Sequence, residues 1–159
     1  MNRRIVSRLS AVALCLLPMS VAAQTPPTNA DALLALRAFR CWGYAERAKE
    51  NVRQGQITKP TAEQELLFNI GYRAVIKFLA AFRRGEISEN TVPVGVLYKI
   101  QGPSDDFIFG RIFEDAAGGA RIAVYALVSE ETHQKSPDET AFRQKATNLF
   151  QSENCSAIK

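Results

Sequence analysis

The sequence predicts a mainly α-helical single domain that is closed by one disulfide bond. Helix start signals precede long stretches in which apolar residues recur at helical spacing. Two cysteines stand near the two ends of the chain that remains after a signal peptide is removed. No repeat and no low-complexity segment suggests another architecture, although a short hairpin within residues 94–128 is an alternative for the middle of the chain.

The N-terminus has the pattern of a secretory signal peptide. Three arginines and no acid precede an apolar stretch from Leu9 to Met19, which is too short to span a bilayer. Val21 and Ala23 occupy the positions that signal peptidase reads, so we expect cleavage after Ala23. Residues 1–23 are then the signal peptide, residues 24–159 form one domain, and the mature protein is periplasmic or secreted, without stable membrane insertion.

Removal of the signal peptide changes the charge of the protein. The chain has 20 lysines and arginines against 16 acids, and three of the arginines lie within residues 1–23, so the mature net charge falls to about +1. Nucleic-acid binding requires a strongly cationic surface, which this balance does not provide. We therefore expect no nucleic-acid partner.

Two cysteines, Cys41 and Cys155, remain after cleavage. In an oxidising compartment they are expected to pair, and no CxxC motif indicates redox activity. The predicted bond closes almost the whole domain. For a loop of that length the chain-entropy estimate of its stabilisation is about 4–5 kcal/mol.

The first predicted helix follows Asn29 as N-cap and extends to Gly55, with Gly43 as a weak point. Its apolar positions recur at helical spacing: Leu33, Leu36, Phe39, Cys41, Trp42, Ala45, Ala48 and Val52.

The second helix starts with a capping box formed by Thr61 and Gln64 and extends to Arg84, ahead of Gly85. Its predicted inward face comprises Leu67, Ile70, Ala74, Val75, Phe78, Ala81 and Phe82.

Three further segments complete the prediction. Pro93 opens a short helix over residues 94–100, or this segment is a strand paired with residues 122–128, which otherwise form a helix after Gly118 and Gly119. Ser104 caps a helix in which Ile108, Phe109, Ile112, Phe113 and Ala116 share one side, and the helix dipole explains Asp105 and Asp106 in its first turn. Ser136, Pro137 and Glu139 start the last helix, whose inward residues are Phe142, Ala146, Leu149 and Phe150.

No motif in the sequence identifies a reaction. The single histidine, His133, lies in a polar stretch and is expected to be a solvated loop residue. Adjacent acids such as Asp105 and Asp106 point about 100° apart on a helix, so they do not form the facing pair that glycoside hydrolysis needs. Phosphate-binding loops and dinucleotide turns are absent from the sequence, and we expect neither a cofactor nor a metal.

Two surface features are candidates for partner binding. A stripe of Asn69, Arg73, Lys77 and Arg84 is predicted to form the solvent-facing edge of the second helix, either for solubility and ion pairs or to receive an acidic partner. Phe107 falls on the polar side of its helix, between Arg111 and Glu114, where a second helix could cover it or a partner could bind.

Scattered positions resemble a known family. A cysteine in the first helix (Cys41), the pair Gly71 and Tyr72, and the closing Phe150 and Cys155 resemble small disulfide-linked periplasmic immunity proteins that neutralise type VI secretion amidases. Here four residues separate the last aromatic from the last cysteine, more than is usual in that family. The segment over residues 92–114 resembles one found in uncharacterised secreted bacterial proteins.

Together these features predict a non-enzymatic binding protein of the immunity or inhibitor type, whose partner is another envelope or secreted protein. An envelope stress or chaperone-like protein is the alternative function. A third is an enzyme acting on cell-wall glycan.

Overall fold

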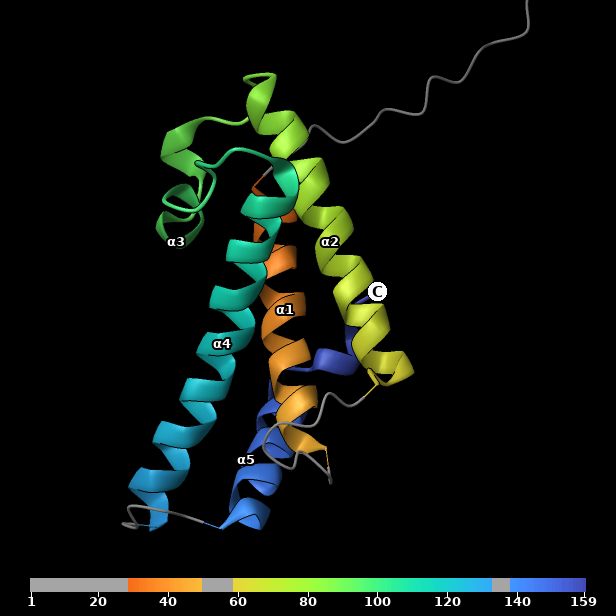
Figure 1. The fold of residues 1–159 in the computed structure, drawn as a ribbon, viewed down its shortest axis with the longest axis vertical. Helices are drawn as coiled ribbons and strands as arrows, with labels where there is room; N and C mark the ends of the chain where they lie inside the picture. Colours follow the sequence, from red (N-terminus) through yellow and green to blue (C-terminus); the bar gives the residue numbers. More distant parts are fainter. Residues whose placement is uncertain (1–28, 50–58, 133–137) are drawn as a thin grey trace, which may run out of the picture.

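The structure is a computed structural model that describes residues 29–49, 59–132 and 138–159. Five α-helices and two short 3-10 helices, with no strand in these ranges, form an all-α single domain (Figure 1). The elements are α1 (Ala30–Ala48), α2 (Ala62–Arg83), η1 (Glu89–Thr91), α3 (Val94–Leu97), α4 (Asp105–Thr132), α5 (Glu139–Ser152) and η2 (Cys155–Ala157). The predicted fold class is confirmed, and the middle of the chain is helical, not a hairpin.

Helix α1 lies in the middle of the bundle. It packs against α2, α4 and α5, whereas α2 and α4 touch each other much less (Figure 1). Its buried residues are mostly small: Ala32, Ala35, Ala38, Cys41 and Gly43, with Phe39 and Tyr44 as the large ones. Leu33, one of the apolar residues at helical spacing, is 52% exposed, because the alanine stripe carries the helix contacts.

Two glycines let helices approach closely. A Cβ added to Gly43 would lie 2.7 Å from the carbonyl oxygen of Ala117, so α1 and α4 cross in near backbone contact. A Cβ on Gly71 of α2 would lie 2.1 Å from the ring of Phe39. Helix α1 continues through Gly43, the expected weak point, and the missing side chain makes room for α4.

The core forms two clusters that α1 connects. One joins the N-terminal half of α1 to the C-terminal half of α2, to α3 and to the start of α4. The other joins the C-terminal half of α1 to the start of α2, the end of α4, α5 and η2. The predicted inward face of α2 is confirmed, since Phe82 is partly buried and every other predicted member is buried.

The ends of α2 follow the predicted signals. Thr61 and Gln64 form the capping box, with the Gln64 backbone N–H donating to Thr61 Oγ1 at 3.2 Å and Thr61 N–H donating to Gln64 Oε1 at 3.0 Å. Gly85 has φ +71°, and the amides of Gly85 and Glu86 donate to the carbonyls of Phe82 and Ala81. This Schellman arrangement ends α2 at Arg83, one residue before the predicted end.

Three other boundaries differ from the prediction. Helix α1 ends at Ala48 and not at Gly55, because the backbone of Lys49 is extended. Helix α4 continues through Gly118 and Gly119 as one helix of 28 residues, since the flanking Ala117 and Ala120 are buried.

Helix α5 starts at Glu139. Asp138 is its N-cap and accepts from the Ala141 amide at 2.8 Å. The predicted start signals Ser136 and Pro137, like His133, Val52 and the signal peptide, lie outside the described residues.

One disulfide bond joins α1 to the C-terminus. Cys41 and Cys155 are bonded, with Cα atoms 5.6 Å apart and a separation of 114 positions in sequence. Both cysteines are buried. The predicted covalent closure of the domain is confirmed.

The glycine contacts lead to a matched pair of stability predictions. Gly71→Ala should lower the free energy of unfolding by about 1–3 kcal/mol, because the new methyl group overlaps the Phe39 ring. Gly110→Ala, in α4 with no atom within 4 Å of the added Cβ, should raise it by about 0.5–1 kcal/mol through helix propensity. Urea unfolding of both variants measures the difference, and equal effects would contradict the assigned close contact.

Candidate functional site

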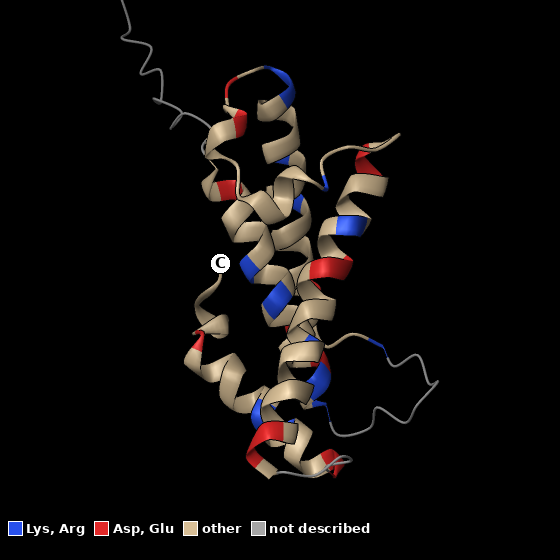
Figure 2. Ribbon diagram, turned by 90° about the vertical axis from the view of Figure 1, so that its left-hand side faces the viewer, with Lys and Arg blue, Asp and Glu red and all other residues tan. Residues whose placement is uncertain are grey.

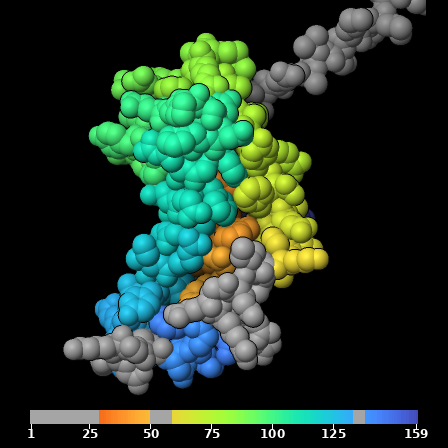
Figure 3. Space-filling model, viewed as in Figure 1, coloured from red at the N-terminus to blue at the C-terminus, as the bar shows by residue number. Residues whose placement is uncertain are grey.

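A row of aromatic side chains lies between α2 and α4 and contacts α1. We call it the aromatic groove. Phe68 and Tyr72 come from α2, Phe109 and Phe113 from α4, and Phe39 and Trp42 from α1. In the space-filling view, part of α1 is visible between α4 and α2 (Figure 3).

The rings meet mostly edge to face. The ring centroid of Phe68 lies 5.4 Å from those of Phe109 and Phe113, and the centroid of Tyr72 lies 5.0 Å from that of Phe109. The interplanar angles of these pairs are 76–86°. Phe39 is fully buried beneath them, whereas Tyr72 is 38% exposed and Phe68, Phe109 and Phe113 are half-buried. These rings thus connect α2 to α4 and remain partly open to solvent.

A pocket of about 380 Å³ opens among the aromatic rings. We call it the Trp42 pocket. Trp42, Phe68 and Phe113 supply aromatic walls, and Pro60, Glu65 and Asn69 complete the lining. Phe113 lies 5.0 Å from Trp42 and 5.4 Å from Phe68. This pocket brings α1, α2 and α4 to one site.

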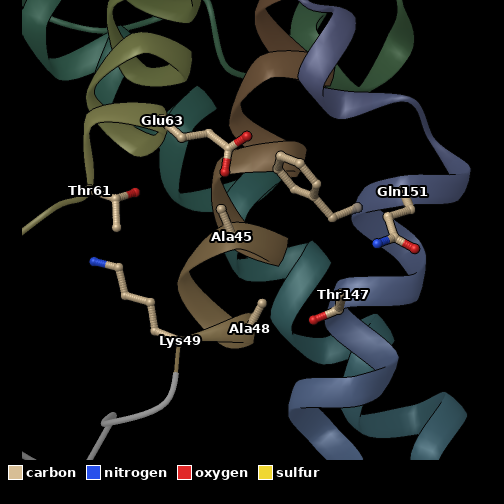
Figure 4. A pocket seen from close by; sticks show the side chains of 8 residues that line it. Ala45, Ala48, Lys49, Thr61, Glu63, Thr147 and Gln151 are labelled. Carbon is tan, nitrogen blue, oxygen red and sulfur yellow. The ribbon is translucent and has the colours of Figure 1, made fainter.

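Two other pockets each have a cationic side chain in their lining. One, of about 270 Å³, lies where α1, α2 and α5 meet, and its lining includes Lys49 and Glu63 (Figure 4). The Lys49 ammonium donates to the carbonyl of Lys59 at 2.9 Å. The other, of about 360 Å³, lies along α1 and α4 and is lined by Arg40, Tyr44 and Asp115 among others.

The junction between α1 and the C-terminus is held by more than the disulfide. Arg37 donates to the carbonyl of Glu153 at 2.9 Å, and the hydroxyl of Tyr44 donates to the Glu153 carboxylate at 3.0 Å. Arg40 lies 3.7 Å from the same carboxylate. Burial first, and then the hydrogen bond and charge of Glu153, raise the pKa of Tyr44 to about 12.

The predicted cationic stripe is exposed, and most of its members have partners. Lys77 pairs with Asp31 of α1 at 3.1 Å, and Arg84 pairs with Glu86. Arg73 donates to the carbonyl of Asn69 at 3.2 Å. Along the ribbon, positions of Lys and Arg are interspersed with positions of Asp and Glu (Figure 2). Two of the three cations of the stripe are thus paired with acids.

The other partner-binding candidates lie next to a loop. Phe107 is 48% exposed, and a Cβ on Gly102 would lie 2.5 Å from its ring. Arg111 lies over that ring at 5.8 Å and donates to the carbonyls of Tyr98 and Gln101 at 3.3 and 3.1 Å. The loop, and not a second helix, therefore covers part of Phe107, and Arg111 anchors that loop.

A helix cap and an ion pair hold the start of α4, where Asp105 and Asp106 lie. Ser104 caps the helix as predicted, since its hydroxyl accepts from the Phe107 amide at 3.2 Å. Asp105 forms an ion pair with Arg83 at the end of α2. Among the described residues, no group of three or more His, Cys, Asp or Glu side chains is arranged to hold a metal ion.

Sequence reasoning did not identify the aromatic groove. Phe109 and Phe113 were expected on one shared side of their helix and Trp42 on the first helix, and Phe68 was not assigned to a face. A usable signal was present: Phe68 and Tyr72, like Phe109 and Phe113, are four residues apart and therefore share one side of a helix. What the sequence lacks is the information that these two sides face each other.

Comparisons with protein families, curated proteins and solved structures find no match to this chain. None of the helices in the described ranges is both long and apolar enough to cross a membrane.

The pKa of Tyr44 predicts a pH dependence of stability. The folded protein keeps this phenol neutral up to about pH 12, whereas an unfolded chain ionises it near the ordinary tyrosine pKa of 10.0. Stability from Tyr44 is therefore complete below pH 10 and is lost as the pH rises toward 12. Urea unfolding over this range should show a steeper loss for the wild type than for Tyr44→Phe, and equal slopes would contradict the assignment.

Proposed function

We propose that this protein is a non-catalytic binding protein of the bacterial envelope, of the immunity or inhibitor type. Its partner, another envelope or secreted protein, binds along the aromatic groove. One observation carries the proposal: aromatic side chains from three helices form a continuous, partly exposed surface beside a pocket. Aromatic residues are enriched in protein interfaces and dominate their binding energy.

The predicted export of the protein supports a location in the bacterial envelope. Residues 1–23 have the pattern of a signal peptide, with cleavage after Ala23, and a disulfide persists in an oxidising compartment such as the periplasm. A disulfide that ties α1 to the C-terminus also fixes one wall of the groove. A groove that needs little ordering on binding costs less conformational entropy.

The alternatives have weaker support. For a glycan-acting enzyme the residues of interest are Asp105 and Asp106, but Asp105 is engaged by Arg83. For a stress or chaperone-like protein, exposed apolar side chains such as Ile122 in α4 and Tyr98 after α3 belong to different elements, and exposed apolar residues are ordinary for a protein surface. The proposal therefore rests on the aromatic groove.

Site-specific photo-crosslinking in the native cell tests the proposal. A photoreactive phenylalanine analogue at Tyr72, on the edge of the groove, should form a covalent adduct with one envelope protein. The same analogue at Ile122, which is 71% exposed on α4, is the control and should form none. No adduct at Tyr72, or the same adduct from both positions, would refute binding along the groove.

Once the adduct has been identified, the purified complex gives a quantitative test. Tyr72→Ala should weaken binding about tenfold or more, as truncation of an aromatic hot-spot residue does in other interfaces. Tyr98→Ala is the matched control, because Tyr98 is 72% exposed and is not one of the groove residues, and it should leave the affinity unchanged.

A further inference from the structure

We infer that the Trp42 pocket binds the cationic side chain of an arginine or lysine that the partner inserts. This inference rests on the proposed function, because the cation is supplied by the partner protein. It assigns to one pocket the chemistry by which the partner is recognised.

The walls of the pocket are suited to a cation. Trp42 and Phe113 meet at 71°, and Phe68 and Phe113 meet at 76°, so the three rings that line the pocket lie in different planes. The face of an aromatic ring carries partial negative charge and attracts an ammonium or guanidinium group, most strongly for tryptophan. Rings in several orientations around one space form the aromatic cage that recognises organic cations.

Glu65 adds a full negative charge to this cage. It is the one ionisable residue in the pocket lining, and no hydrogen bond or ion pair to its carboxylate occurs within the described part of the chain. The helix dipole favours an acid in the first turn of α2 but does not require it to stand beside the rings. A neutral ligand would desolvate this carboxylate without pairing it, whereas a cation would compensate its charge.

The size of the pocket fits one side chain. At about 380 Å³ it lies at the small end of ligand sites, so it can hold the end of a lysine or arginine but not an extended ligand. The other two pockets already contain cations, Lys49 in one and Arg40 in the other. The Trp42 pocket is thus the site among the three where a cation meets an unpaired acid and aromatic walls.

Trp42 provides a direct readout, because it is the single tryptophan of the chain. Three blocked tripeptides, glycine-X-glycine with X as arginine, citrulline or norleucine, are titrated into the oxidised protein at low salt while Trp42 fluorescence is followed. Citrulline has the shape of arginine without its charge. The arginine peptide should bind about fivefold or more tightly than the citrulline and norleucine peptides.

Two glutamate variants form the matched comparison. Glu65→Gln should remove most of the preference for arginine over citrulline. Glu63→Gln, two residues earlier in α2 and in the lining of a different pocket, should keep it. Circular dichroism and thermal unfolding should show that both variants are folded, because both are exposed acids in the first turn of α2 and are expected to contribute similarly to stability.

Three results would overturn the inference: equal binding of the three peptides, no response of Trp42 to any of them, or equal effects of the two variants. Tighter binding of tetramethylammonium than of the arginine peptide would also overturn it, since the ligand would then be a small quaternary ammonium compound. If the arginine preference holds but crosslinking at Tyr72 captures no partner, the pocket chemistry stands and the proposed function fails.

Discussion

The burial of α1 against three other helices is the interaction on which the rest of the structure depends. Its small residues allow close approach: Gly43 admits the backbone of α4, and Gly71 of α2 admits the ring of Phe39. The disulfide from Cys41 fixes the same helix to the C-terminus, and Arg37 and Tyr44 bind the backbone and side chain that precede Cys155. One helix thus organises both core clusters and the closure of the chain.

The aromatic groove follows from this central position. Because α2 and α4 each pack mainly on α1, they touch each other little, and the space between them is filled by large rings. Phe39 is the buried base, and Phe68, Tyr72, Phe109 and Phe113 extend toward solvent. Rings in this position support the bundle while part of their surface stays exposed, so the groove and the core share side chains.

Local signals in the sequence were sufficient for the fold class and for the elements with clear caps. The Thr61 capping box, the Gly85 stop, the Ser104 cap and the pairing of Cys41 with Cys155 each depend on a few neighbouring residues or on a count of cysteines. The continuity of α4 across Gly118 depends on burial against α1, which is a tertiary effect.

The sequence did not predict the aromatic groove because its formation is also a tertiary effect. Helical spacing shows that Phe109 and Phe113 share a side, but their partial exposure is decided by how far α2 stands from α4. The junction of Arg37 and Tyr44 with Glu153 likewise joins residues more than 100 positions apart.

Hydrogen exchange of the oxidised and reduced protein tests the central role of α1 most directly. Amides between Phe39 and Tyr44 should exchange most slowly and only through global unfolding. Reduction of the Cys41–Cys155 bond should speed their exchange by about two to three orders of magnitude, which corresponds to about 3–4 kcal/mol. If α1 exchanged faster than α2 and α4, or if reduction affected only residues 138–159, the account of α1 as the organising helix would be contradicted.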